Sequence, residues 1–93
     1  MEAKYIDLDR LQKWGLTVST LALKLDTLVC EQVAKGNNAM YIDWARHNKE
    51  LPDTLKPLRT LPHLAIIAIA EAFNAKGVSM QIHYMSKELT FTW

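Results

Sequence analysis

The sequence predicts a mixed α+β domain in which a small bundle of about four helices is followed by a C-terminal antiparallel β-hairpin packed on the helical core. Three observations lead to this fold class. Apolar residues recur at three- and four-residue spacing up to position 75, they alternate with polar residues from position 78, and isolated glycines separate the segments. The length of 93 residues fits one compact unit, so we expect a single domain over 1–93.

Two helices are predicted before Gly36. The first covers about 7–14, because Asp7 can cap its start and Gly15 follows its end. The second covers about 17–35 and is opened by Thr17 or Ser19. Its apolar stripe consists of Val18, Leu21, Ala22, Leu25, Leu28, Val29 and Val33.

Two further helices are predicted in the middle of the chain. One covers about 39–49, since Met40, Tyr41 and Trp44 share a helical face and a proline breaks the chain at position 52. The other covers about 61–75, with Thr60 as its cap and Pro62 in its first turn. This helix is apolar almost all round, which is typical of a helix packed from several sides. The residues expected in its packing are Leu64, Ile66, Ile67, Ile69, Ala70 and Phe73.

The alternation after Gly77 predicts a hairpin with strands at about 78–84 and 89–93. We expect Tyr84 to lie opposite Leu89, which gathers the apolar side chains on one face. The same register places Ile82 opposite Phe91 and Met80 opposite Trp93. A two-stranded sheet has two open edges, so we expect a third strand from residues 4–6, a second copy or another protein.

Composition and charge argue against several classes of protein. Eleven Lys and Arg against ten Asp and Glu give a net charge of +1, so no overall field attracts nucleic acid or an anionic membrane. The lone Cys30 has no disulfide partner in the chain, and the N-terminal residues lack the layout of a secretion signal. The apolar run 64–70 is too short to span a bilayer. We therefore expect a cytoplasmic protein with no membrane association.

The inventory of reactive side chains argues against catalysis. His47, His63 and His83 do not stand at the spacings of a nucleophilic or metal site, and an Asp43–His47 pair on a helix is typical of a surface contact. Cys30 lies among apolar residues, where a free cysteine behaves as a small buried hydrophobe. We predict no enzyme activity, no metal and no cofactor.

One segment suggests an alternative function. Over residues 11–22 a short helix is followed by a glycine, an apolar residue, a capping threonine and a second helix. This order resembles the turn of helix-turn-helix DNA-binding proteins. The resemblance implies a transcriptional regulator with DNA contacts from Lys13, Thr17, Ser19, Thr20 and Lys24. Because Lys24 is the only cation over two turns of the second helix, we do not favour this alternative.

The leading hypothesis is a small non-enzymatic protein that modulates or inhibits a macromolecular partner, above all a protein. Small neutral domains of this kind are frequent among inhibitors, adaptors and accessory factors, including those of phages and mobile elements. We also expect a homodimer, formed through the open edge of the terminal strand or through aromatic residues on the helical side, because a small domain has a thin stability margin and the terminal strand contains no proline or lysine. The residues expected to bind the partner or a second copy are Trp14, Tyr41, Trp44, Leu89, Phe91 and Trp93.

Overall fold

The computed structural model describes residues 3–44 and 53–93. The helical elements are the 3₁₀ helix η1 (Leu8–Trp14), α1 (Leu16–Ala34), the 3₁₀ helix η2 (Asp53–Arg59) and α2 (His63–Asn74). The strands are β1 (Ala39–Asp43), β2 (Ser79–His83) and β3 (Glu88–Thr92). The α+β class predicted from the sequence is confirmed, and the sheet has one strand more than the predicted hairpin.

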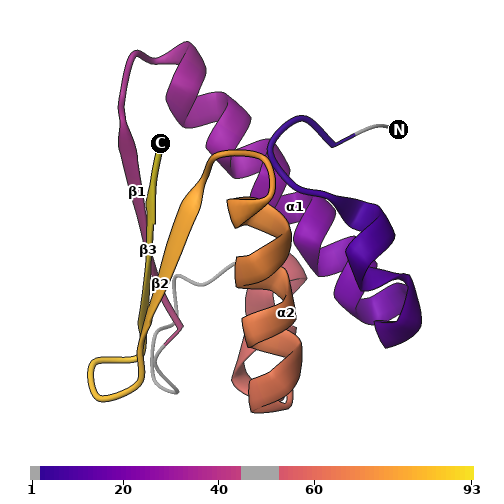
Figure 1. The fold of residues 1–93 in the computed structure, drawn as a ribbon. Helices are drawn as coiled ribbons and strands as arrows, with labels where there is room; N and C mark the ends of the chain where they lie inside the picture. The colour runs from indigo at the N-terminus through magenta and orange to yellow at the C-terminus, as the bar shows by residue number, and fades with distance from the viewer. Residues whose placement is uncertain (1–2, 45–52) are drawn as a thin grey trace.

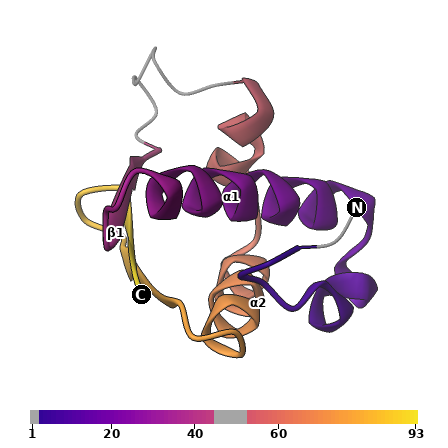
Figure 2. The same cartoon turned by 90° about the horizontal axis from the view of Figure 1, so that it is seen from above.

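The strands form an antiparallel sheet in the order β1-β3-β2. The C-terminal strand β3 is thus the central strand, and β1 and β2 are the edges. The helices lie on one face of this sheet and leave the other face open (Figure 1). Seen from above, α1 runs across the molecule while α2 is viewed almost end-on, so the two helices cross steeply (Figure 2).

The register of the sheet forms two apolar rows on the covered face. Leu89 of β3 lies between Ile42 and Ile82, and Phe91 lies between Met40 and Met80. The Phe91 ring meets Phe73 of α2 edge to face, with ring centroids 5.2 Å apart. The largest fully buried side chains are Ile6, Leu11, Leu21, Leu25, Val29, Leu58, Ile69, Phe73, Val78, Leu89 and Phe91.

The predicted helix over 39–49 is wrong where the structure describes it, because residues 39–43 form strand β1. Met40, Ile42 and Trp44 are buried while Tyr41 and Asp43 are exposed, which is the two-residue period of a strand. Met40 and Trp44 also stand four apart, so the same residues matched a helical face. Residues 45–49 of the prediction lie outside the described residues.

The predicted pairing of the hairpin is shifted by two residues. Ile82, and not Tyr84, lies opposite Leu89, and Met80 lies opposite Phe91. Tyr84 instead begins the turn, and its hydroxyl makes a hydrogen bond with His63 Nδ1 at the start of α2. A shift of two residues keeps every side chain on its face, so alternation alone did not distinguish the two registers.

The two 3₁₀ helices follow a three-residue spacing of leucines. In η1, Leu8 and Leu11 point toward the core, and Asp7 accepts a hydrogen bond from the Asp9 backbone N–H at 3.2 Å, as the predicted cap requires. In η2, for which the sequence predicts no helix, Leu55 and Leu58 are both buried. Side chains three apart lie on one side of a 3₁₀ helix, so this spacing turns both members of each pair toward the core, although Leu8 is only partly buried.

The N-terminal segment is held on α1 by a buried carboxylate. Asp26 is only 5% exposed, and its two oxygens accept hydrogen bonds from the backbone N–H groups of Lys4 (3.2 Å) and Tyr5 (2.5 Å). These bonds satisfy the buried charge and place Ile6 in the core. Residues 4–6 are therefore an anchored bend and not the third strand considered from the sequence.

A membrane-spanning helix is not found in the described ranges, since none of their helices combines the necessary length with sufficient hydropathy.

Candidate protein-binding surface

Helix α2 has one buried face and one partly open face. Ile66, Ile69 and Phe73 are buried, whereas Leu64 is 65% exposed and Ile67 is partly exposed. The expectation that Leu64 and Ile67 belong to the core is thus corrected. The described elements that pack on α2 are mainly η1 and β2, so its outward face lies between them.

A groove runs between η1 and α2, and we refer to it as the η1–α2 groove. Its volume is about 500 Å³. Its lining residues are Arg10, Lys13, Trp14, Leu64, Ile67, Ala68 and Glu71. The apolar members come from both elements, and they include a tryptophan, a residue type enriched at protein interfaces.

The charged residues of the η1–α2 groove are divided between its walls. Arg10 and Lys13 stand on η1, and Glu71 stands on α2. The Arg10 guanidinium is paired with Asp7 at 3.2 Å, while the Lys13 ammonium lies 5.9 Å from the centroid of the Trp14 ring. The cation–π contact holds the Lys13 charge next to the apolar surface.

A second hollow, the α2–β2 groove, lies on the other side of α2 and measures about 240 Å³. Its lining residues are Ile67, Ala70, Glu71, Asn74, Ser79 and Met80. Ile67 and Glu71 therefore contribute to both grooves. Helix α2 forms a ridge with an open hollow along each flank.

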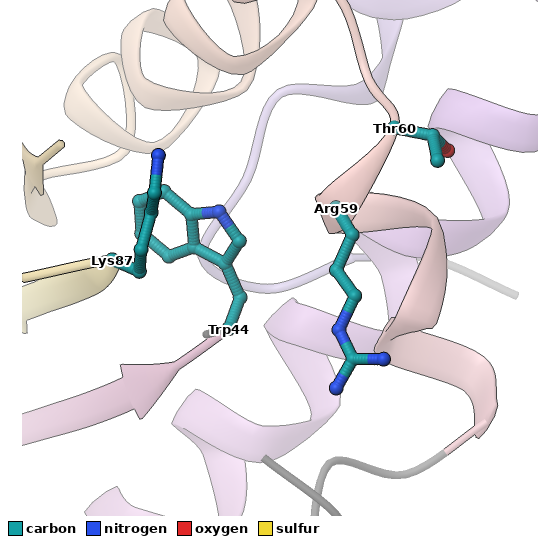
Figure 3. A pocket seen from close by; sticks show the side chains of 4 residues that line it. All are labelled: Trp44, Arg59, Thr60 and Lys87. Atoms are coloured by element: carbon teal, nitrogen blue, oxygen red, sulfur yellow. The ribbon is translucent and has the colours of Figure 1, made fainter. Parts of the chain in front are cut away.

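A third hollow, of about 720 Å³, lies where Trp44, Arg59, Thr60 and Lys87 meet (Figure 3). Lys87 extends beside the Trp44 indole, while Arg59 points in a different direction from the opposite wall. The Thr60 hydroxyl already donates to the Pro57 carbonyl at 3.2 Å. The two cationic side chains that the structure describes in this hollow, Lys87 and Arg59, thus do not point toward one another.

The six residues predicted to bind a partner lie in different environments in the structure. Leu89 and Phe91 are fully buried and Trp44 is 6% exposed, so these three belong to the chain's own core. The Trp93 indole N–H donates to the Asn37 carbonyl at 3.0 Å and ties down the chain end. Tyr41 is 66% exposed on the open face of the sheet.

Only Trp14 among those six lies in the η1–α2 groove, where its indole N–H is buried without a hydrogen-bond partner in the described chain. Sequence reasoning missed Leu64, Ile67 and Ala68 as surface residues. The signal that could have found them is the all-round apolar pattern of α2, because a domain with few elements cannot cover every side of such a helix.

The five residues of the DNA-binding alternative lie on two elements. Lys13 is on η1 in the wall of the groove, and the other four are on α1. Thr17 and Thr20 are exposed, whereas Ser19 and Lys24 are partly buried. The predicted first helix of the motif is the 3₁₀ helix η1, and not the α-helix that such DNA readers place before the turn.

Reactive groups in residues 3–44 and 53–93 do not form a cluster of three or more that could hold a metal ion. Burial raises the pKa of the Cys30 thiol, and the nearby Asp26 carboxylate raises this pKa further. A raised pKa lowers the fraction of reactive thiolate. His83 shares a hydrogen bond with Thr90 at 3.1 Å across the open face of the sheet.

Comparisons with models of protein families, with curated proteins and with solved structures gave no match to this chain. Its function is therefore inferred from the geometry of its own surface.

Proposed function

We propose that this chain is a small, non-enzymatic binding protein that works in the cytoplasm and modulates a protein partner bound in the η1–α2 groove. The observation that carries the proposal is the exposed Leu64 on α2, beside Trp14, Ile67 and Ala68. Fully burying a leucine side chain stabilises a complex by about 1.5–3 kcal/mol. A contiguous apolar strip rimmed by charges is a typical protein-interaction surface.

The apolar lining and the charges of the groove favour an amphipathic helix as the bound segment. Helices bind such grooves through apolar side chains spaced three or four residues apart. Lys13 stands on one wall and Glu71 on the other, so the groove orients a charged ligand. The partner helix therefore carries an acidic residue on the side that faces η1, next to its apolar stripe.

A displayed library of helical peptides tests this proposal with the purified protein as bait. We expect enrichment of amphipathic sequences that combine apolar residues at helical spacing with a flanking Asp or Glu. Leu64→Ser should lower the affinity for the selected peptides about tenfold or more, because it removes the exposed apolar centre of the groove. Lys13→Glu should lower the affinity for these peptides by a larger factor than Leu64→Ser and reverse the preference for acidic residues.

Met85→Ser is the matched control, since Met85 is fully exposed in the β2–β3 turn and does not line the groove. This variant should bind the selected peptides as the wild type does. Enrichment of no peptide, or equal loss of affinity in Met85→Ser and Leu64→Ser, would contradict the proposal.

A further inference from the structure

The free edge of β2 can be located from the hydrogen bonds of the central strand. The Trp44 N–H donates to the Lys87 carbonyl at 2.8 Å, and the Trp93 N–H donates to the Asn38 carbonyl at 3.4 Å. Backbone groups of successive strand residues point to opposite sides. The odd-numbered residues of β3 therefore face β1, and its even-numbered residues face β2.

The same alternation fixes the direction of the β2 backbone. Gln81 lies opposite Thr90, so the odd-numbered residues of β2 bond to β3. The N–H and C=O groups of Met80 and Ile82 consequently point away from the sheet. The described residues provide no strand on that side, because the order of the sheet is β1-β3-β2.

The two edges of the sheet differ in how much apolar surface they leave open. Ile42 on β1 and Ile82 on β2 flank the same Leu89, but Ile42 is 7% exposed and Ile82 is only partly buried. The α2–β2 groove also opens beside Met80. A fourth strand at β2 would cover Ile82, whereas Ile42 at the β1 edge is already buried within the chain.

We propose that the occupant of this edge is a second copy of the chain, paired β2 to β2 in antiparallel fashion about a two-fold axis at Gln81. Met80 of each copy then lies opposite Ile82 of the other, and the outward N–H and C=O groups of these residues form about four hydrogen bonds. Both sheets join into one continuous sheet of twice the size. Such an interface uses the same surface from each subunit, as a two-fold dimer requires.

The side chains of β2 are complementary to themselves in this arrangement. On the covered face, Ile82 of one copy enters the α2–β2 groove beside Met80 of the other. On the open face, Gln81 meets Gln81 and Ser79 meets His83, so no like charges are opposed. The strand also lacks the lysine or proline that commonly prevents edge pairing.

This inference replaces the dimer expected from the sequence through an open edge of the terminal strand. That strand is β3, which is paired on both sides within one chain. The inference goes beyond the proposed function, since it concerns the opposite flank of α2 and requires no other protein.

Sedimentation velocity on the purified chain, from low to high micromolar concentration, tests the proposal. We expect a species of twice the 10.6 kDa mass of one chain. Gln81 is exposed, so Gln81→Lys and Gln81→Glu should fold normally. Each should raise the dissociation constant of the dimer by about tenfold or more, because two like charges meet at the axis. An equimolar mixture of the two variants should restore the dimer.

Tyr41→Lys is the matched control, because Tyr41 and Gln81 lie opposite Thr90 from the two edges of the sheet. It should leave the dimer intact. A 10.6 kDa monomer for the wild type over the whole range would overturn the proposal. So would a dimer that Tyr41→Lys dissociates and Gln81→Lys does not. The peptide selection tests the η1–α2 groove separately, through Leu64 and Lys13, which do not line the α2–β2 groove.

Discussion

The inward and outward faces of α2 carry similar residues but lie in different surroundings. Ile69 on the inward face is fully buried, and Ile67, two positions earlier, lines two open grooves. Phe73 packs against Phe91 on the inward side, whereas Leu64 is largely exposed on the outward side. Composition alone therefore does not distinguish the part of this helix that stabilises the fold from the part that is available to bind.

The difference follows from the number of elements that can surround the helix. The sheet and η1 cover part of its circumference, and the remaining strip stays open between them (Figure 1). In a larger domain, an additional element would bury an apolar strip of this kind. In this protein the strip stays exposed, which is why we propose it as the surface that a partner covers.

The largest effect is expected for Ile69→Ala. This substitution leaves a cavity in a fully buried site, and we expect it to lower the free energy of unfolding by about 2–5 kcal/mol. Chemical denaturation measures this loss from the shift of the midpoint at constant slope. A loss below about 1 kcal/mol would mean that the inward face of α2 does not hold the core together.

Ile67→Ala should have a smaller effect, of about 1 kcal/mol, since its side chain is partly exposed and leaves little enclosed cavity. Complete burial of Ile67, as expected from the sequence, would instead give a loss of about 2–5 kcal/mol. The same denaturation experiment, run beside Ile69→Ala, compares the two faces directly. Equal losses for both variants would remove the distinction between them.

Leu64→Ser should change the free energy of unfolding by no more than about 0.5 kcal/mol, because most of the leucine side chain is exposed. It should also shorten retention on a hydrophobic-interaction column, since it removes exposed apolar surface. Met85→Ser, which removes an apolar side chain outside the grooves, measures the effect of exposure alone. A large loss of stability in Leu64→Ser would show that this residue is structural.

The smallest effect is expected for the DNA-binding alternative. Lys13→Ala and Lys24→Ala should leave duplex DNA binding as weak as it is in the wild type, because few cations lie near these positions to contact phosphates. Fluorescence anisotropy with a labelled duplex at physiological salt measures this binding. Tight binding with a steep dependence on salt would instead support a helix-turn-helix regulator.

The sequence predicts much of the helical structure correctly because its signals there are local. The Asp7 cap is observed as predicted, and α1 and α2 begin and end within a few residues of their predicted limits. The caps predicted at Thr17 or Ser19 and at Thr60 are wrong, because the N-cap positions are Gly15 and Pro62, without a side-chain hydrogen bond. Gly77, at a φ of +89°, turns the chain from α2 into β2, where glycine adopts the left-handed region without steric cost. Each of these features depends on residues close together in the chain.

The sheet was harder to predict because its pairing is not local. Strand β1 is separated from β3 by more than forty residues, and Met40 and Trp44 match a helix as well as a strand. The hairpin register differs by two residues from the predicted one, since alternation defines the face of each side chain but not its partner. The observed turn from Tyr84 to Lys87, with Lys87 at a φ of +56°, decides that register.

The candidate site could be predicted only in part. Trp14 was expected to bind a partner and lies in the η1–α2 groove. Leu64 and Ile67 were assigned to the core, because the sequence shows that a helix is apolar but not which neighbours surround it. The sequence predicts Leu89 and Phe91 at an interface because the hairpin has an open edge, whereas β1 occupies that edge and both side chains are buried in the core.

The most direct test of the binding surface is a nuclear magnetic resonance titration of the labelled protein with the tightest peptide from the displayed library. We predict that amide shifts will concentrate in η1 around Lys13 and Trp14 and in α2 from Leu64 to Glu71. The open face of the sheet around Tyr41 should show little change. Shifts centred on that open face, with η1 and α2 unaffected, would contradict the assignment of the η1–α2 groove as the binding surface.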